Sequence, residues 1–283
     1  MSGISRGAHH MGIGKRTAGF SLVELMIAMV LGILVMGAAF AIFMSNQNTY
    51  RANEGLNRIQ ESARTAVELI SRDIRAAGGS ACSNLATMET SDGNSVSLDR
   101  NPVSGDANEI TIVSGSELAY PTDASTANSV TIAASELDQA SDVFNVGDVL
   151  VLCDAQKTFV VTATGVSGRT VTFSPSATFH YPVSVMLGRF RSTRWFVEPN
   201  GRGTGNSLFV SRAAGAREEV AEGVESIAFS YLQPGGVFTP TPADWNQVAA
   251  VRMVLTLQAQ NSIDGRALSR TATSVVNLRA RSL

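Results

Sequence analysis

Hydrophobic and polar positions along the chain follow three patterns, one after another. From Leu25 to Tyr50 no residue carries a charge, and a run of this length can cross a bilayer core as a helix. Between residues 51 and 77, apolar residues recur every three or four positions, which is the spacing of one helix face. From about residue 90 onward, apolar and polar residues alternate with period two, which favours β-strands.

The first two patterns predict a single long helix from about Ser21 to Ala77. The opposite face of its second half alternates in charge, and Glu54 with Arg58 is one acid-first pair worth about 0.2–0.5 kcal/mol. The glycine pair that begins at Gly78 is a helix stop. The predicted apolar stripe consists of Leu56, Ile59, Ala63, Ala66, Ile70, Ile74 and Ala77.

The third pattern predicts a body made of β-strands. No second long helical period occurs, so the expected fold class is α+β: a long N-terminal helix packed on a C-terminal antiparallel β-sheet domain. The segment 165–169 is predicted to be a tight turn. The segments expected as strands are residues 95–98, 109–113, 129–133, 148–154, 158–164, 170–174, 184–198, 207–212, 225–232, 250–260 and 270–280.

Charge argues against nucleic acid as a partner. The net charge is −2, and removal of residues 1–19 would take away the positive charges of Arg6, Lys15 and Arg16. A mildly acidic chain has no general electrostatic attraction for nucleic acid, so we expect no nucleic acid partner.

Few residues are available for catalysis or metal binding. Two cysteines, Cys82 and Cys153, are too few for a four-ligand zinc site. Of the three histidines, His9 and His10 lie near the N-terminus, so a Ser/His/Asp site in the body would have to use His180. We therefore expect no catalytic residues, no metal and no cofactor, and the protein is predicted not to be an enzyme.

Other candidate motifs fail on closer inspection. The segment 201–205, GRGTG, follows a strand but precedes no helix, so it is predicted to be a turn and not a phosphate loop. The segment 92–99, DGNSVSLD, lacks the twelve-position calcium loop with its terminal glutamate. We interpret Trp195, Phe196 and Trp245 as core or sheet packing.

The apolar run by itself fits two interpretations. It fits a plain signal-anchor helix or a secretory signal peptide cut after Ala39-Phe40-Ala41. Both must accommodate Glu24, because an ionised acid at the bilayer centre costs about 2.5–3.5 kcal/mol on insertion scales and less near the interface.

The stretch GFSLVELMIAMVLG, residues 19–32, resembles the class III leader junction of type IV pilins and type II secretion pseudopilins. The resemblance implies that a prepilin peptidase cuts after Gly19 and methylates the new amino terminus of Phe20. It also implies that Glu24 pairs with the Phe20 amino group of a neighbouring subunit in the filament core. A buried charge is tolerable when it is paired, so Glu24 would set the register between subunits.

Further stretches resemble the PilW family of type IV pilus minor pilins. They are residues 73–82, 146–155, 207–232 and 247–260, and the last two also resemble the type II secretion pseudopilin J. The implied domains are a leader at 1–19, a transmembrane or filament-core helix at 20–44, its amphipathic continuation at 45–79, and a β-rich periplasmic or surface body at 80–283.

The resemblance places Cys82 and Cys153 outside the cytoplasm, where a disulfide can persist. Such a bond would stabilise the body by about 4 kcal/mol in the chain-entropy model. The alternative is two separately buried thiols, although the polar segment before Cys82 favours the disulfide.

The implied function is structural. Such a minor pilin resides in the inner membrane before assembly, then primes and joins a type IV pilus at or near its tip. Its partners are the prepilin peptidase, other minor pilins, the major pilin and the inner-membrane assembly platform. The alternatives are a minor pseudopilin of a type II secretion system and an adhesive or DNA-uptake pilin.

Overall fold

The first element is the helix α1, which runs from Leu22 to Ala76 without interruption. Its weakest helix formers are glycines such as Gly32 and Gly37, and no proline occurs in this segment to break it. Beyond the last helical residue, Gly78 adopts a φ of 71°, a left-handed conformation that glycine adopts without strain. The bounds agree with the predicted helix within one residue at each end.

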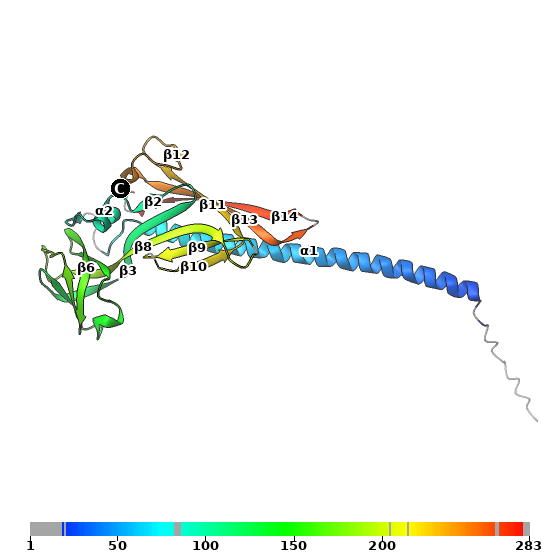
Figure 1. Cartoon of the computed structure of the whole chain (residues 1–283), viewed down its shortest axis with the longest axis horizontal. Helices are drawn as coiled ribbons and strands as arrows, with labels where there is room; N and C mark the ends of the chain where they lie inside the picture. Colours follow the sequence, from blue (N-terminus) through cyan, green and yellow to red (C-terminus); the bar gives the residue numbers. More distant parts are fainter. Residues whose placement is uncertain are drawn as a thin grey trace, which may run out of the picture. The chain divides into compact units, whose positions relative to one another are not determined.

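The computed structural model describes residues 19, 21–81, 86–203, 205–213, 215–263 and 266–279 (Figure 1). The chain divides into two units, Met1–Arg51 and Ala52–Leu283. The first contains the apolar half of α1, and the second contains its C-terminal half and both β-sheets. The predicted α+β fold is confirmed, while the predicted domain boundaries at residues 19, 44 and 79 stay predictions.

Strands of the larger sheet form a closed ring. Neighbours pair antiparallel in the order β3–β4–β7–β6–β5–β8, and β8 pairs back onto β3. Closure is possible because β3 pairs with β8 over its first part and with β4 over its last part. The ring strands are β3 (Glu109–Ser125), β4 (Ser129–Ile132), β5 (Val149–Cys153), β6 (Lys157–Ser167), β7 (Thr170–Ser174) and β8 (Met186–Pro199).

Apolar side chains of these strands form a core cluster of their own. Along β4 and β7, every second residue is buried, which is the pattern of strands with one face inside a core. The cluster includes Val130, Ile132, Phe144, Leu150, Leu152, Phe159, Val161, Phe173 and Leu187.

Further elements complete the two sheets. The larger sheet also contains β1 (Thr87–Met88), β2 (Val103–Gly105), β9 (Asn206–Arg212) and β10 (Arg217–Glu222). The second sheet has the order β12 (Phe238–Thr239), β11 (Val224–Leu232), β13 (Ala250–Ile263) and β14 (Arg266–Asn277). Short helical segments are α2 (Gly93–Asp99), η1 (Ala140–Asp142) and η2 (Trp245–Gln247).

The main core joins the C-terminal half of α1 to both sheets. The α1 residues in this core cluster are Ile59, Ala66, Ile70 and Ile74, all from the predicted stripe, and Gly55 and Ser71 of α1 are also buried. The predicted packing role of the aromatic residues is confirmed: Trp195 and Phe196 are buried. Trp245 packs partly buried against this core, edge-to-face with Tyr231 at 4.8 Å between ring centroids.

One predicted strand is wrong. Residues 95–98 lie in α2, which begins after Asp92, and the Asp92 side chain accepts a 2.8 Å hydrogen bond from the Ser95 backbone N–H. This N-cap satisfies a helix donor that would otherwise lack a partner. Each of the other predicted strands overlaps an observed strand. The sequence patterns did not predict β1, β2, β10, β12 or the extension of β3 beyond residue 113.

Candidate functional site

The predicted cleavage point lies just before α1. Gly19 is exposed and outside the helix, whose first turn is closed by a 3.1 Å hydrogen bond from the Leu25 N–H to the Ser21 carbonyl oxygen. A Cβ on Gly19 would meet no heavy atom within 4 Å. The fold itself therefore does not require glycine at this position. Phe20, the residue predicted to be methylated, lies outside the described residues.

Glu24 lies in the first turn of α1, as its third residue, and is exposed. A carboxylate there is favoured by the positive end of the helix dipole. Ser21 immediately precedes the helix, and the spacing from Ser21 to Glu24 is that of a capping box. The position and spacing of Glu24 are therefore also those of a helix-starting residue. Its pairing with a neighbouring subunit stays a prediction.

The N-terminal half of α1 presents an apolar surface on all sides. Its large apolar side chains between Leu22 and Met44 are 41–76% exposed. Within the described part of the chain, α1 is the helix long and apolar enough to span a bilayer. A helix that is apolar all round is stable when lipid or other helices surround it.

The C-terminal end of α1 is attached to β3 and β8. The indole N–H of Trp195 donates a 2.9 Å hydrogen bond to Asp73 Oδ2. Past the helix, the Gly78 N–H donates to the Val113 carbonyl oxygen at 2.9 Å, and the Gly115 N–H donates to the Gly79 carbonyl oxygen at 2.7 Å. Gly115 favours this approach, because a Cβ there would lie 3.2 Å from that oxygen, which is a tight contact.

Cys153 is the last residue of β5 and is 1% exposed. It is not a free thiol in the structure. Cys82 lies outside the described residues, so the pairing of these two cysteines stays a prediction.

The residue after Cys153 holds a loop in place. Asp154 is buried, and its carboxylate accepts hydrogen bonds from four backbone N–H groups: Gln156 and Lys157 at 2.8 Å each, His180 at 2.6 Å and Tyr181 at 2.9 Å. Burial raises the pKa of Asp154, but the four donors together outweigh burial, so this pKa lies below its usual value. Asp154 therefore has a structural role.

His180, the histidine considered for catalysis, is exposed and stacks edge-to-face on Tyr181. Its backbone, not its imidazole, contacts Asp154. Among the described residues no group of three or more His, Cys, Asp or Glu side chains is placed to hold a metal ion. The absence of enzymatic activity stays a prediction.

Comparison with known families gives one match. The family model of the prokaryotic N-terminal methylation motif matches residues 14–40, which include Gly19, Phe20, Glu24 and most of the apolar run. Searches of curated proteins and of solved structures gave no match to the chain.

The matched motif implies processing by a prepilin peptidase and assembly with other pilins, and the apolar helix that begins within it fits membrane anchoring before assembly. The motif and this helix together indicate that the chain is the precursor of a pilin or pseudopilin.

Proposed function

We propose that this protein is a minor pilin of the PilW kind, which primes assembly of a type IV pilus and is incorporated at or near its tip. The observation that carries the proposal is the methylation motif at residues 14–40, placed at the start of a helix whose N-terminal half is apolar on every side. The PilW assignment rests on the resemblance of residues 73–82 and 146–155 to that family.

The N-terminal segment carries the assembly function. The peptidase cuts between Gly19 and Phe20 and methylates the new amino terminus. In the filament, the apolar half of α1 packs among the helices of other subunits, and Glu24 pairs with the Phe20 amino group of a neighbour. Such a pair stabilises only the correct register, because a carboxylate left unpaired in an apolar core is strongly destabilising.

The body at residues 80–283 provides contacts with neighbouring subunits, and a disulfide between Cys82 and Cys153 stabilises it. The burial of Cys153 at the end of a ring strand supports this pairing, since the bond would tie the segment after α1 to the ring. The protein is a substrate of the peptidase and has no catalytic residues of its own.

The test is the intact mass and N-terminal sequence of the protein isolated from membranes of cells with and without the prepilin peptidase. A methylated Phe20, present only with the peptidase, supports the proposal. An unprocessed chain would mean that the N-terminal helix is a plain membrane anchor. A start at Ile42 would mean a secreted β-rich protein and would remove the role given to Glu24.

A second measurement separates the pilus from the secretion system. Surface filaments sheared from cells are expected to contain the protein, and its deletion is expected to reduce the number of pili. If deletion instead blocks export of secreted enzymes and leaves pili unchanged, the protein is a type II secretion pseudopilin.

A further inference from the structure

The larger sheet has a break along one edge of β8. One edge of this strand pairs with β3 from Glu109↔Phe196 to Pro121↔Met186. The other edge is shared by two strands: β5 pairs up to Leu150↔Arg189, and β9 pairs from Thr193↔Arg212 onward. In the described chain, neither β5 nor β9 has a register partner for residues 190–192. The break lies between the start of β5 and the end of β9.

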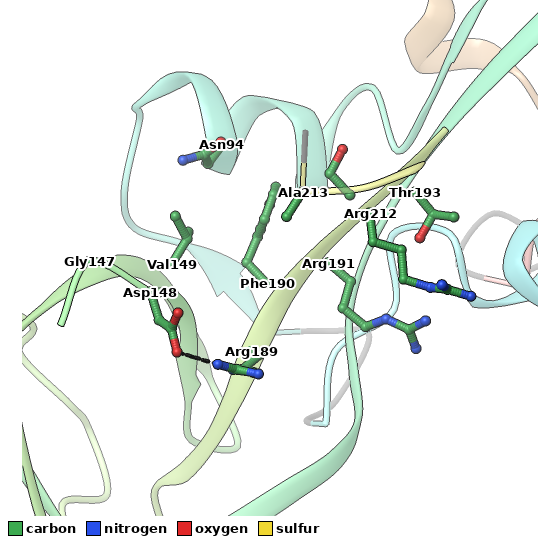
Figure 2. A pocket seen from close by; sticks show the side chains of 11 residues that line it. Asn94, Gly147, Asp148, Val149, Arg189, Phe190, Arg191, Thr193, Arg212 and Ala213 are labelled. Carbon is green, nitrogen blue, oxygen red and sulfur yellow. Dashed lines mark hydrogen bonds and ion pairs between the residues drawn. The ribbon is translucent and has the colours of Figure 1, made fainter. Parts of the chain in front are cut away.

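A cavity of about 690 Å³ opens at this break (Figure 2). Volumes of this size are typical of sites that bind small molecules or a few residues of a peptide. One wall is apolar and consists of Val149 and Phe190, with Asn94 of α2 beside them. The remaining lining is strongly basic for an acidic protein, because it contains Arg189, Arg191 and Arg212 but only one carboxylate, that of Asp148.

Two of the three arginines have counter-ions. Arg189 donates to Asp148 Oδ2 from Nη2 at 2.5 Å and from Nε at 3.2 Å (Figure 2). Arg212 pairs with Glu218 at 2.6 Å. For the guanidinium of Arg191, in contrast, the described residues provide neither an ion pair nor a hydrogen bond.

Arg191 and Arg212 lie on the same face of the sheet. Arg212 is the register partner of Thr193, and Arg191 is two residues from Thr193 along β8, so the pleat directs all three side chains to one side. Figure 2 shows the two arginine side chains extending in the same direction from neighbouring strands. Arg212 already pairs with Glu218, and an anion placed between the two arginines would give Arg191 a counter-ion as well.

We propose that this cavity binds an extended peptide segment of a partner protein through a carboxylate held by Arg191 and Arg212. The planar guanidinium groups match the two oxygens of a carboxylate, and the apolar wall accepts a neighbouring side chain of the same peptide. A peptide fits better than nucleic acid, whose binding depends on many phosphate contacts along a basic surface, whereas this chain is acidic overall. The site goes beyond the proposed function, since neither leader processing nor helix packing uses it.

The test uses the full-length protein in detergent micelles and fluorescence anisotropy of labelled hexapeptides. An acidic peptide that alternates Glu with Val is compared with the same peptide carrying Gln in place of Glu. The acidic peptide is expected to bind, and the Gln peptide at least about tenfold more weakly, because charge-assisted hydrogen bonds are lost.

Substitutions of single arginines test whether the acidic peptide binds at this cavity. Arg191→Ala should weaken binding of the acidic peptide about tenfold. Arg191→Lys should give an intermediate affinity, because lysine keeps the positive charge but lacks the planar guanidinium group that donates two parallel hydrogen bonds to a carboxylate. Neither change removes an ion pair in the described structure, so the melting temperature should stay within about two degrees of wild type. The matched control is Arg270→Ala, which removes an exposed arginine of β14 and should leave the affinity unchanged.

Three results would overturn the proposal. The first is that neither peptide binds. The second is an equal loss of affinity in Arg191→Ala and Arg270→Ala, which would mean non-specific attraction between charges. The third is tighter binding of a single-stranded oligonucleotide than of the acidic peptide, with the same dependence on Arg191, which would make the cavity a phosphate site.

Discussion

The side chains of Asp73 and Trp195 join the long helix to the larger sheet through a 2.9 Å hydrogen bond between Oδ2 and the indole N–H. Trp195 is 2% exposed, so water cannot replace the carboxylate as the partner of its indole N–H without a rearrangement of the core. Because Asp73 lies in the last turn of α1, the bond attaches the C-terminal end of the helix to the larger sheet.

Removing this hydrogen bond should loosen the attachment of α1. Trp195→Phe is expected to lower the free energy of unfolding by about 1–3 kcal/mol, since it deletes the donor and part of the buried ring. Urea titration followed by circular dichroism in detergent measures the change. The double-mutant cycle with Asp73→Ala should give a coupling energy of about 1 kcal/mol or more, and strictly additive effects would contradict the role of the pair.

Substitution of Gly19 should block processing. Gly19→Val is expected to leave the leader attached, and the mass of the membrane-bound protein measures this directly. Gly32→Val is the matched control, because a Cβ at either glycine meets no heavy atom within 4 Å. Normal processing of both variants would show that the cut lies elsewhere.

Neutralising Glu24 should separate processing from assembly. Glu24→Ala is expected to be cleaved normally, yet to be reduced at least about tenfold in sheared filaments, because the α-amino group of the neighbour then lacks its partner. Immunoblots of membrane and filament fractions measure both steps. Glu61→Ala removes an exposed glutamate from the same helix and should assemble normally. Equal incorporation of the two variants would refute the intersubunit pair.

The two cysteines should be linked. A peptide map made without reductant is expected to contain a Cys82–Cys153 linked pair that disappears on reduction. Reduction should lower the free energy of unfolding by at most about 4 kcal/mol, the chain-entropy value for a loop of this length. If both cysteines react with an alkylating reagent after denaturation without reductant, the predicted bond does not exist.

The stability that the hydrogen bonds of Asp154 give to the protein should be lost in acid. The pKa of Asp154 in the folded protein lies below its unfolded value of about 3.9. The ionised carboxylate therefore contributes to the free energy of unfolding above that pH, and this contribution is lost as the pH falls through the folded pKa. Below about pH 4, the wild-type melting temperature should therefore fall more steeply than that of Asp154→Asn. Asp138→Asn, in an exposed segment, is the control. Parallel pH profiles for wild type and Asp154→Asn would contradict this account.

Local patterns predicted the long helix and most strands because both depend on the spacing of apolar residues. Residues 95–98 misled the strand prediction, since a four-residue alternation also fits one turn of a short helix. The deciding signal was Asp92, whose side chain caps α2. The later part of β3 was missed because Pro121 interrupts the β-forming pattern, although that residue pairs with Met186.

Long-range features had no local signature. Ring closure depends on the pairing of β3 with β8, which are distant in sequence. The cavity lined by Arg191 and Arg212 exists because β5 begins and β9 ends along the same edge of β8, and an isolated arginine such as Arg191 carries no signal in the sequence. The processing residues could be proposed from the sequence because they act as a contiguous motif, whereas the cavity is assembled from separate segments.

The closed ring also has a consequence for crowding. Apart from the break along β8, each ring strand in the described chain has neighbours on both sides, so few of its backbone groups are available as a template for a strand of another molecule. Exposed strand edges of neighbouring molecules could otherwise pair with each other and aggregate where the local protein concentration is high, as along a filament or in a membrane patch. Closure of the ring thus lets this part of the protein lie close to other pilin bodies without forming a shared sheet.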